Sequence, residues 1–202
     1  MASLRVAQKE LTRKRLLTTA LSLFESRGYS ATTIDEIATA AGTTRVTFYA
    51  HFPSRRDIMH ALIEELNELL GRSASPEHRS TALGLVEAVS EGSASAIGRW
   101  LREQAARWPD IRPYILVATE AAAVDPEIRA VFNSWFDEVI ADITEGLAAA
   151  GRYDPATHYF RGELAVGMLD RLALHWMEHH WDIASSPALD VLTEAWTKLL
   201  GD

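Results

Sequence analysis

Hydrophobic residues recur every three or four positions along most of this 202-residue chain, with polar residues between them. This spacing is typical of amphipathic α-helices, and no stretch shows the alternation expected of a β-strand. Four prolines that each follow Ser or Asp indicate further helix starts, because proline at the first helical position loses no hydrogen bond. The pattern predicts an all-α fold of nine helices, at residues 8–27, 33–41, 44–52, 54–71, 77–107, 110–123, 126–150, 155–183 and 187–200.

The segment from Thr33 to Asp57 carries the most specific local signals. Thr33 is a good N-cap residue, and Glu36 three positions later completes a capping box. Gly42 stands where the first helix must end, a place that favours a left-handed conformation, and Thr44 can cap a second helix. Two short helices around a tight glycine turn form a helix-turn-helix, whose second helix enters the major groove of DNA.

This segment resembles the DNA-binding signature of the tetracycline-repressor (TetR/AcrR) family. A Tyr-x-His-Phe run at this offset is not a general helix-turn-helix feature, so the match is specific for its length. It departs from the family pattern at Thr43, where a core valine is usual, and at Val46, where glycine or alanine is frequent. The residues in register are Thr33, Ile37, Ala38, Ala41, Gly42, Thr47, Phe48, Tyr49, His51, Phe52, Ser54, Arg55 and Asp57.

The resemblance implies a homodimeric, sequence-specific regulator of transcription that binds double-stranded operator DNA and is not an enzyme. In that family, a small molecule bound in the body changes the distance between the two DNA-binding domains and releases a near-palindromic operator. Repression is the expected effect, although activation is an open alternative because the sign depends on where the operator lies relative to a promoter.

The first residues of the second helix are the candidates for reading bases. Arg45 can contact guanine O6 and N7 through two hydrogen bonds, and Val46 can pack on a thymine methyl group. Thr43 is included in the same outward surface. For Tyr49 and His51 the alternative is packing or capping inside the small domain. The candidates for phosphate contacts, which position the protein without reading sequence, are Thr33, Thr44, Thr47, Tyr49, His51 and Arg55.

The predicted domains are residues 1–53, a three-helix DNA-binding domain, and residues 54–202, a helical ligand-binding and dimerisation domain that begins with a connecting helix at 54–71. Residues 1–60 hold nine basic and five acidic side chains, a net charge of +4, whereas the remainder holds 11 basic and 23 acidic side chains, a net charge of −12. This asymmetry favours phosphate binding at the N-terminal end and solubility of the body. Arg13, Lys14 and Arg15 fit this view equally well as a solvated helix face.

The composition narrows the cellular context. The chain has no cysteine, which excludes disulfides and thiolate metal sites and agrees with a reducing compartment. No apolar run is long enough to span a bilayer, and the N-terminus lacks the apolar block of a secretion signal. We therefore expect a cytoplasmic protein without a membrane partner.

Two late segments are apolar enough to contact a second subunit. Residues 164–177 are hydrophobic nearly all round, and the last helix repeats apolar residues at helical spacing. The resemblance implies that these two helices pair with their two-fold copies in a four-helix bundle. A dimer would place two recognition helices about 34–36 Å apart on DNA. The predicted interface residues are Leu169, Leu172, Trp176, Leu192, Trp196 and Leu199.

Aromatic residues of the body are candidates for the effector pocket that the resemblance implies. Such residues line many apolar ligand sites, which favours a small apolar or aromatic effector, but they fill ordinary cores just as readily. The candidates are Trp100, Trp108, Tyr114, Phe132, Trp135, Phe136 and Trp176.

A histidine cluster offers the competing hypothesis of a helical metalloenzyme or ligand carrier. His175 and His179 share a helical face, His180 follows, and Glu178 or Asp182 can add an oxygen ligand. These ligands are too few to assign a metal, and His158 lies too far along the helix to join them. We therefore expect no metal, no cofactor and no catalytic residues.

Overall fold

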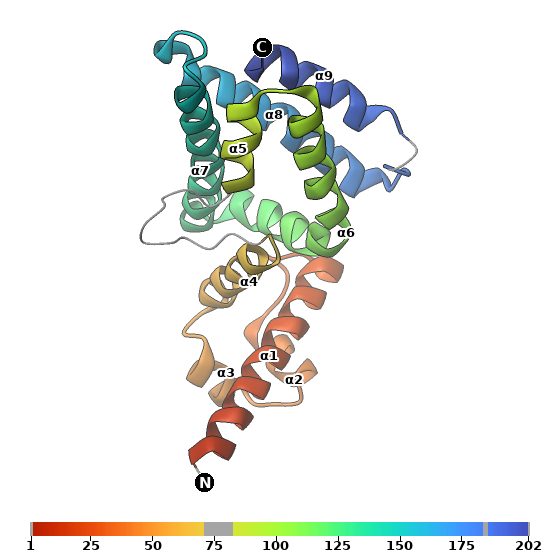
Figure 1. Cartoon of the computed structure of the whole chain (residues 1–202). Helices are drawn as coiled ribbons and strands as arrows, with labels where there is room; N and C mark the ends of the chain where they lie inside the picture. The colour runs from red at the N-terminus through yellow and green to blue at the C-terminus, as the bar shows by residue number, and fades with distance from the viewer. Residues whose placement is uncertain (1, 71–82, 184–185, 202) are drawn as a thin grey trace. The chain divides into compact units, whose positions relative to one another are not determined.

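The computed structural model describes residues 2–70, 83–183 and 186–201. Within these residues every regular element is an α-helix (Figure 1), which confirms the predicted all-α fold. The helices are α1 (Ala2–Arg27), α2 (Ile34–Ala40), α3 (Arg45–His51), α4 (Arg55–Leu69), α5 (Leu83–Glu91), α6 (Ala94–Val124), α7 (Pro126–Ala150), α8 (Pro155–His179) and α9 (Ala188–Leu200).

The first of two compact units combines the N-terminal helices with a segment from the middle of the chain. It consists of Met1–Asn67 and Pro113–Phe132, and so includes the end of α6 and the start of α7. Phe24, Ile37 and Phe48 come from α1, α2 and α3 and are all buried in its core. The apolar faces of α1, α2 and α3 therefore meet around one hydrophobic cluster. Because Phe48 packs into this cluster, the cluster fixes the orientation of α3 within the unit.

The second unit consists of Glu68–Arg112 and Asn133–Asp202. In its core, the rings of Trp100 and Trp196 stack with centroids 5.6 Å apart, and Trp196 Nε1 donates a hydrogen bond to the carbonyl of Ala165 at 3.1 Å. Helices α7 and α8 pack closely, since a Cβ at Gly162 would lie 3.0 Å from Ile140 Cγ2. A side chain at position 162 would therefore require Ile140 to shift.

The helix predicted at 77–107 is wrong as a single element. Its described part divides into α5 and α6, and residues 77–82 lie outside the described residues. Gly92 adopts a φ of +70°, which ends α5, and the Ser93 hydroxyl accepts the Ala96 amide at 3.1 Å, which starts α6. The sequence signal for this break was Gly92 followed by Ser93, a glycine that can end one helix and a serine that can cap the next. The hydrophobic residues on both sides keep the spacing of a single helix, which hid the signal.

The predicted break between residues 107 and 110 is also wrong, because α6 continues through Pro109 and Pro113. An interior proline ordinarily costs about 3 kcal/mol through its lost hydrogen bond and steric clash. Trp108, Ile111 and Ile115 surround the two prolines and are buried. Packing of this apolar face offsets the free-energy cost of an interior proline.

Three further helix ends differ from their predicted positions by two residues or more. Helix α1 begins at Ala2 rather than residue 8. Helix α8 ends at His179 rather than residue 183, because His180 turns into a left-handed conformation with a φ of +52°. Helix α4 ends at Leu69, and residue 71 of the predicted connecting helix lies outside the described residues.

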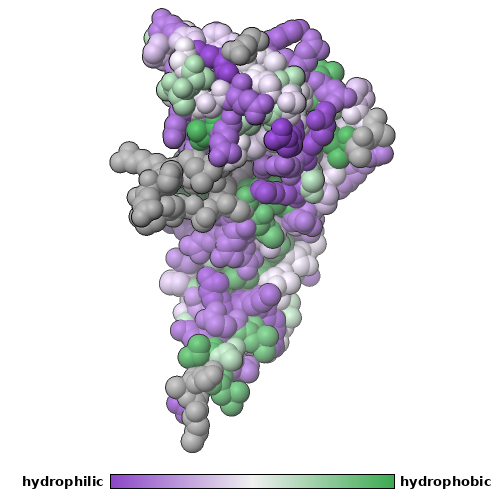
Figure 2. Space-filling view, viewed as in Figure 1, coloured by the Kyte–Doolittle hydropathy of each residue, from purple (hydrophilic) through white to green (hydrophobic). Residues whose placement is uncertain are grey.

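Hydrophilic residues dominate the face of the molecule shown in Figure 2, and hydrophobic residues appear there in small groups. Among the described helices, none combines the length and apolarity needed to cross a membrane.

Candidate nucleic-acid interface

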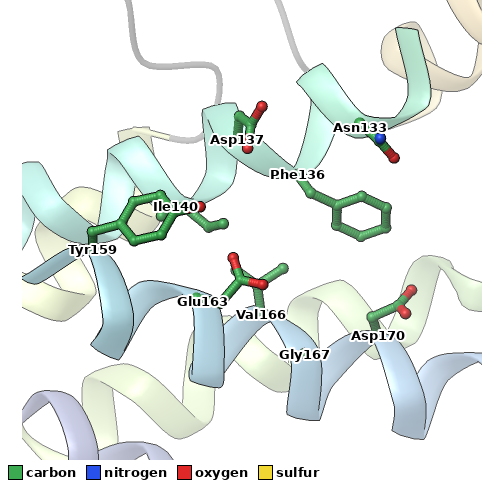
Figure 3. Close-up of a pocket in the computed structure, with 9 residues that line it drawn as sticks. All are labelled: Asn133, Phe136, Asp137, Ile140, Tyr159, Glu163, Val166, Gly167 and Asp170. Carbon is green, nitrogen blue, oxygen red and sulfur yellow. The ribbon is translucent and has the colours of Figure 1, made fainter. Parts of the chain in front are cut away.

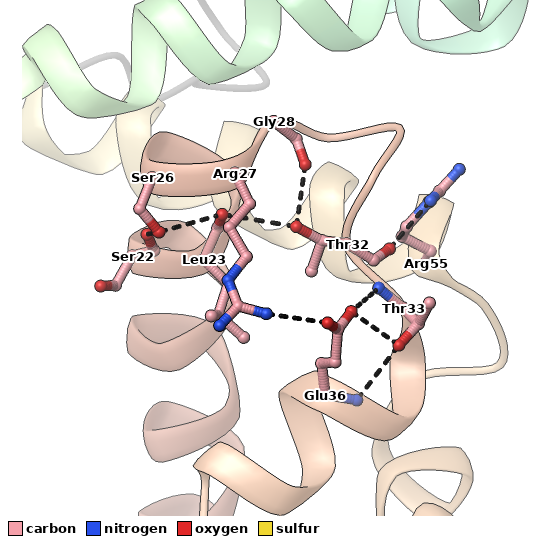
Figure 4. Close-up of polar contacts among 9 residues, drawn as sticks. All are labelled: Ser22, Leu23, Ser26, Arg27, Gly28, Thr32, Thr33, Glu36 and Arg55. Atoms are coloured by element: carbon pink, nitrogen blue, oxygen red, sulfur yellow. Dashed lines mark hydrogen bonds and ion pairs between the residues drawn. The ribbon is translucent and has the colours of Figure 1, made fainter.

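The capping box predicted at the start of α2 is present. The Glu36 amide donates to Thr33 Oγ1 at 3.3 Å, and the Thr33 amide donates to Glu36 Oε2 at 2.8 Å (Figure 4). Arg27 of α1 forms an ion pair with the same carboxylate at 2.8 Å. The bonds from the backbone and side chain of Thr33 and the charge of Arg27 lower the pKa of Glu36. These contacts fix the first turn of α2 against the end of α1.

The turn between α2 and α3 depends on Gly42. Its φ of +66° lies in the left-handed region, where a side chain is strained, although a Cβ there would have room. The amides of Gly42 and Thr43 return to the carbonyls of Thr39 and Ala38 at 3.0 and 2.9 Å. Thr44 then caps α3 by accepting the Thr47 amide at 3.2 Å. The helix-turn-helix predicted from the sequence is therefore formed.

Helix α3 has a buried face and an exposed face. Phe48 points into the core, and Phe52 just beyond the helix is also buried. Val46 and Tyr49 are 80% and 43% exposed, and Thr44 and Arg45 are exposed as well. Thr43 and Thr47 are half-buried. The predicted base-reading residues thus lie on the outward side of a capped helix.

Arg45 is held in place by two neighbours within the helix-turn-helix. Its guanidinium donates to Asp35 Oδ2 at 3.0 Å and to the Tyr49 hydroxyl at 3.3 Å. The Tyr49 hydrogen bond and the Asp35 charge raise the pKa of Arg45 above its ordinary value, so it stays charged. Tyr49 therefore orients Arg45 in the free protein. Its predicted contact with phosphate stays a prediction.

His51 lies at the C-terminal end of α3, beside basic residues of α1. Its Nδ1 is buried without a hydrogen-bond partner among the described residues. Burial, followed by the charges of Lys9 and Arg13, lowers the pKa of this histidine. Arg13 also lies over the Phe52 ring, 5.1 Å from its centroid. Sequence reasoning did not single out Lys9, although it lies within the helix predicted at residues 8–27, one turn before Arg13.

Arg55 has internal partners that the sequence did not predict. Its Nη1 donates to the carbonyls of Ser30 and Thr32 at 3.1 and 2.9 Å, and its guanidinium lies 4.4 Å from the Tyr29 ring centroid. Figure 4 shows this side chain reaching toward the loop before α2. Arg55 therefore positions the loop that carries Thr33, and its phosphate contact stays a prediction.

The segment 113–132 is tied to the helix-turn-helix part of the first unit by polar contacts. Glu120 accepts the Tyr29 amide at 3.0 Å. Arg56 at the start of α4 pairs with Asp125 at 2.8 Å and with Glu127 at 2.7 Å. The end of α6 and the start of α7 thus support the loop after α1 and the start of α4.

Most of the aromatic residues predicted for an effector pocket pack against other side chains of the described structure. Trp100 belongs to the core of the second unit, Trp108 packs on Trp176 with centroids 5.6 Å apart, and Trp135 packs edge-on against Phe136. Tyr114 and Phe132 pack in the first unit. Side-chain packing, the alternative stated from the sequence, accounts for most of them.

Phe136 alone of these aromatic residues lines a hollow of about 400 Å³ between α7 and α8 (Figure 3). Burial raises the pKa of Asp170 at one end of the hollow. The sequence signal was weak, because the lining comes from alternate turns of two helices. The lining residues are Asn133, Phe136, Asp137, Ile140, Tyr159, Glu163, Val166, Gly167 and Asp170.

Three of the six predicted dimer-interface residues need correction, and the other three stay a prediction. Leu192 and Trp196 are buried within the protomer, because α9 packs its apolar face on the second unit's core. Trp176 of α8 is buried against Trp108. Leu169, Leu172 and Leu199 are half-buried against the same core. The large apolar side chains that α8 and α9 leave exposed are Tyr159, Phe160, Leu164 and Val191.

The histidine cluster is only partly assembled. His175, Glu178 and His179 lie together on the exposed end of α8. His180 packs on Trp176, and the buried His158 is bonded to the Arg152 carbonyl at 2.7 Å.

The helix-turn-helix region matches a known sequence family. The family described as "Bacterial regulatory proteins, tetR family" matches residues 16–62. The chain is 34% identical over 77 residues to the HTH-type transcriptional regulator SrpR of Pseudomonas putida, which covers 38% of this chain and 36% of that protein. It is 28% identical over 146 residues to the HTH-type transcriptional repressor KstR2 of Mycolicibacterium smegmatis, and this match covers 67% of this chain and 68% of KstR2. The chain thus spans about a third of the length of SrpR.

Solved structures share the fold along nearly the whole chain. NalD of Pseudomonas aeruginosa has a TM-score of 0.65 at 19% identity, covering 95% of this chain and 97% of that one. A TetR-family regulator from Mesorhizobium loti has a TM-score of 0.64 at 18% identity, covering 95% and 96%. At these identities the likeness establishes the fold alone, and the N-terminal matches supply the family. The chain belongs to the TetR/AcrR family of helix-turn-helix transcriptional regulators.

Proposed function

We propose that this regulator is a homodimeric repressor that binds a near-palindromic operator and is released from it by a small apolar or aromatic molecule. The observation that carries the DNA-binding part is the exposed face of α3, where a capped helix presents Arg45 and Val46 outward. The family is one of regulators, so the metalloenzyme alternative is not retained.

Arg45 and Val46 are the proposed base-reading pair. A guanidinium held by Asp35 and Tyr49 has fewer rotamers to lose on binding guanine. The phosphate contacts are proposed for Thr33, Thr44 and Thr47 at the two helix starts, with Tyr49, His51 and Arg55 around them. Lys9 and Arg13 join this set because they lie beside His51. Thr43 supports the turn from which α3 starts.

The proposed dimer uses the exposed apolar face of α8 instead of the residues buried in the protomer. Phe160 and Leu164 are 65% and 59% exposed, one turn apart on that helix. Burying them against a two-fold copy would remove apolar surface from water, which is the main drive for association. Two such protomers would offer two α3 helices to successive major grooves.

The proposed effector acts through the helices that are shared by both units. Residues 94–112 of α6 belong to the second unit, whereas its end carries Glu120, which holds the Tyr29 amide in the first unit. The hollow between α7 and α8 has an apolar wall of Phe136, Ile140 and Val166. A molecule bound in the body releases DNA only if it prefers the conformation with low operator affinity.

Repression is the proposed sign of regulation. KstR2 is named as a repressor, and NalD as the secondary repressor of the MexAB-OprM multidrug efflux pump. Whether the bound protein represses or activates transcription depends on where the operator lies relative to the promoter.

Selection of bound sequences from a random duplex library at physiological salt tests this proposal. Recovery of an inverted repeat with half-sites about one helical turn apart is the expected result. Retention of DNA without a shared motif, and with strong salt sensitivity, would show non-specific phosphate binding and overturn the proposal.

A further inference from the structure

The C-terminal end of α8 brings together three side chains that ligate metals. One donor atom from each of His175, Glu178 and His179 lies within 4.8 Å of the other two, and all three residues are exposed. We propose that this cluster, the α8 histidine site, binds a divalent transition metal ion such as Zn²⁺. This inference concerns the second unit and does not rest on the proposed DNA binding.

Helix geometry puts the three ligands on one side. Residues three and four positions apart are neighbours on a helix surface, which places Glu178 and His179 beside His175. The two imidazole rings have centroids 4.3 Å apart and an interplanar angle of 36°. Ligands about 2.0–2.2 Å from a tetrahedral zinc lie within about 3–4 Å of one another. Small rotations of these exposed side chains are enough to close the cluster on an ion.

The hydrogen bond of His179 prepares it as a ligand. Its Nδ1 lies 2.9 Å from the His175 carbonyl oxygen, which can only accept, so Nδ1 carries the proton. Nε2 of the neutral ring then keeps its lone pair for a metal. Metal-binding histidines commonly donate their second ring nitrogen to a carbonyl in this way, which fixes the tautomer and the ring orientation.

The local charge favours a cation. The last turn of a helix carries partial negative charge from its unpaired carbonyl groups, and Glu178 adds a carboxylate. Two imidazoles with one carboxylate suit zinc and its neighbours in the transition series, whereas magnesium and calcium prefer oxygen ligands alone. Three protein ligands leave at least one coordination position for water.

His180 provides a matched control that sequence alone would have placed in the site. Its backbone is left-handed, and its ring packs on Trp176 with centroids 5.9 Å apart and an interplanar angle of 73°. It is absent from the group of ligand atoms around His175. His180→Asn removes an adjacent imidazole while keeping a residue that tolerates the left-handed conformation.

Isothermal titration of the 202-residue chain with ZnCl₂ tests the proposal, with MgCl₂ as the ion control. We expect one Zn²⁺ per protomer and no heat with Mg²⁺. His175→Ala and His179→Ala should each lower Zn²⁺ affinity by about tenfold or more, since even loss of an outer-shell partner costs about 10–100-fold. Alanine is a good helix former, so these exposed substitutions keep α8 intact, which circular dichroism verifies.

Glu178→Gln should weaken binding less than loss of either histidine, and His180→Asn should leave it unchanged. Absence of Zn²⁺ binding to the wild-type protein up to about 1 mM would overturn the proposal. Binding that survives His175→Ala and His179→Ala but is lost in His180→Asn would overturn it as well, because the ion would then lie elsewhere.

Discussion

Substitution of Arg45 by alanine separates base reading from simple charge attraction. In the free protein the guanidinium pairs with Asp35 at 3.0 Å, with side-chain exposures of 58% and 61%. An exposed pair of this kind contributes about 0–1 kcal/mol to stability. The variant should therefore fold with nearly unchanged thermal stability.

The expected loss in operator affinity is much larger. A bidentate arginine–guanine contact contributes about 1–3 kcal/mol of discrimination at one base pair. A dimer makes this contact twice, once in each half-site, so the loss is about 2–6 kcal/mol if the half-sites contribute additively. At about 1.4 kcal/mol per factor of ten, affinity should fall by roughly 30-fold to more than 10⁴-fold.

Arg27→Ala is the matched control for this substitution. Arg27 lies in the same unit and pairs with Glu36 at 2.8 Å, and its side chain is 55% exposed, but it is not a predicted DNA contact. Fluorescence anisotropy with the selected operator should show a small, salt-dependent loss for Arg27→Ala. It should show a loss of base preference at one position of each half-site for Arg45→Ala. Equal losses for the two variants, with base preference unchanged, would refute base reading by Arg45.

Three further predictions test the scaffold around the interface. Thr33→Ala removes the α2 cap and should cost about 1 kcal/mol, which lowers the Tm by roughly 2–4 °C in scanning calorimetry; an unchanged Tm would contradict the role of the capping box. Trp196→Ala should lower the free energy of unfolding in urea by about 3–5 kcal/mol, since the side chain is buried in the protomer. Loss of the dimer without loss of protomer stability would show that Trp196 belongs to the dimer interface instead. The pKa of His51 in the folded state lies below its ordinary value of 6.5, so the unfolded state binds the proton first and the free energy of unfolding falls as pH drops below about 6.5. His51→Gln should flatten this part of the curve of stability against pH. A curve identical to that of the wild-type protein would contradict the burial of His51.

The helix-turn-helix was predictable because its determinants are local. Thr33, Glu36, Gly42 and Thr44 act on residues within four positions, so their spacing in the sequence specifies the caps and the turn. The buried face of Phe48 follows from the same helical period. Local rules failed in α6, where tertiary packing carries the helix through Pro109 and Pro113.

The functional surfaces of the body were less predictable because burial depends on distant partners. A stripe of apolar residues on α9 fits a dimer interface and a protomer core equally well, and only the stacking of Trp196 on Trp100 decides between them. The Asp35 partner of Arg45 and the carbonyl partners of Arg55 are also non-local, at ten and 23 to 25 positions away. Sequence periodicity identifies such faces but does not assign what covers them.

The spacing of the two half-sites tests the central claim of a dimer on a near-palindromic operator most directly. About five base pairs, or half a helical turn, inserted at the centre of the selected operator would rotate one half-site to the opposite side of the duplex. Two α3 helices fixed in one dimer cannot then reach both half-sites, so affinity should fall to that of a single half-site. Unchanged affinity and stoichiometry would show that protomers bind independently and would contradict the account.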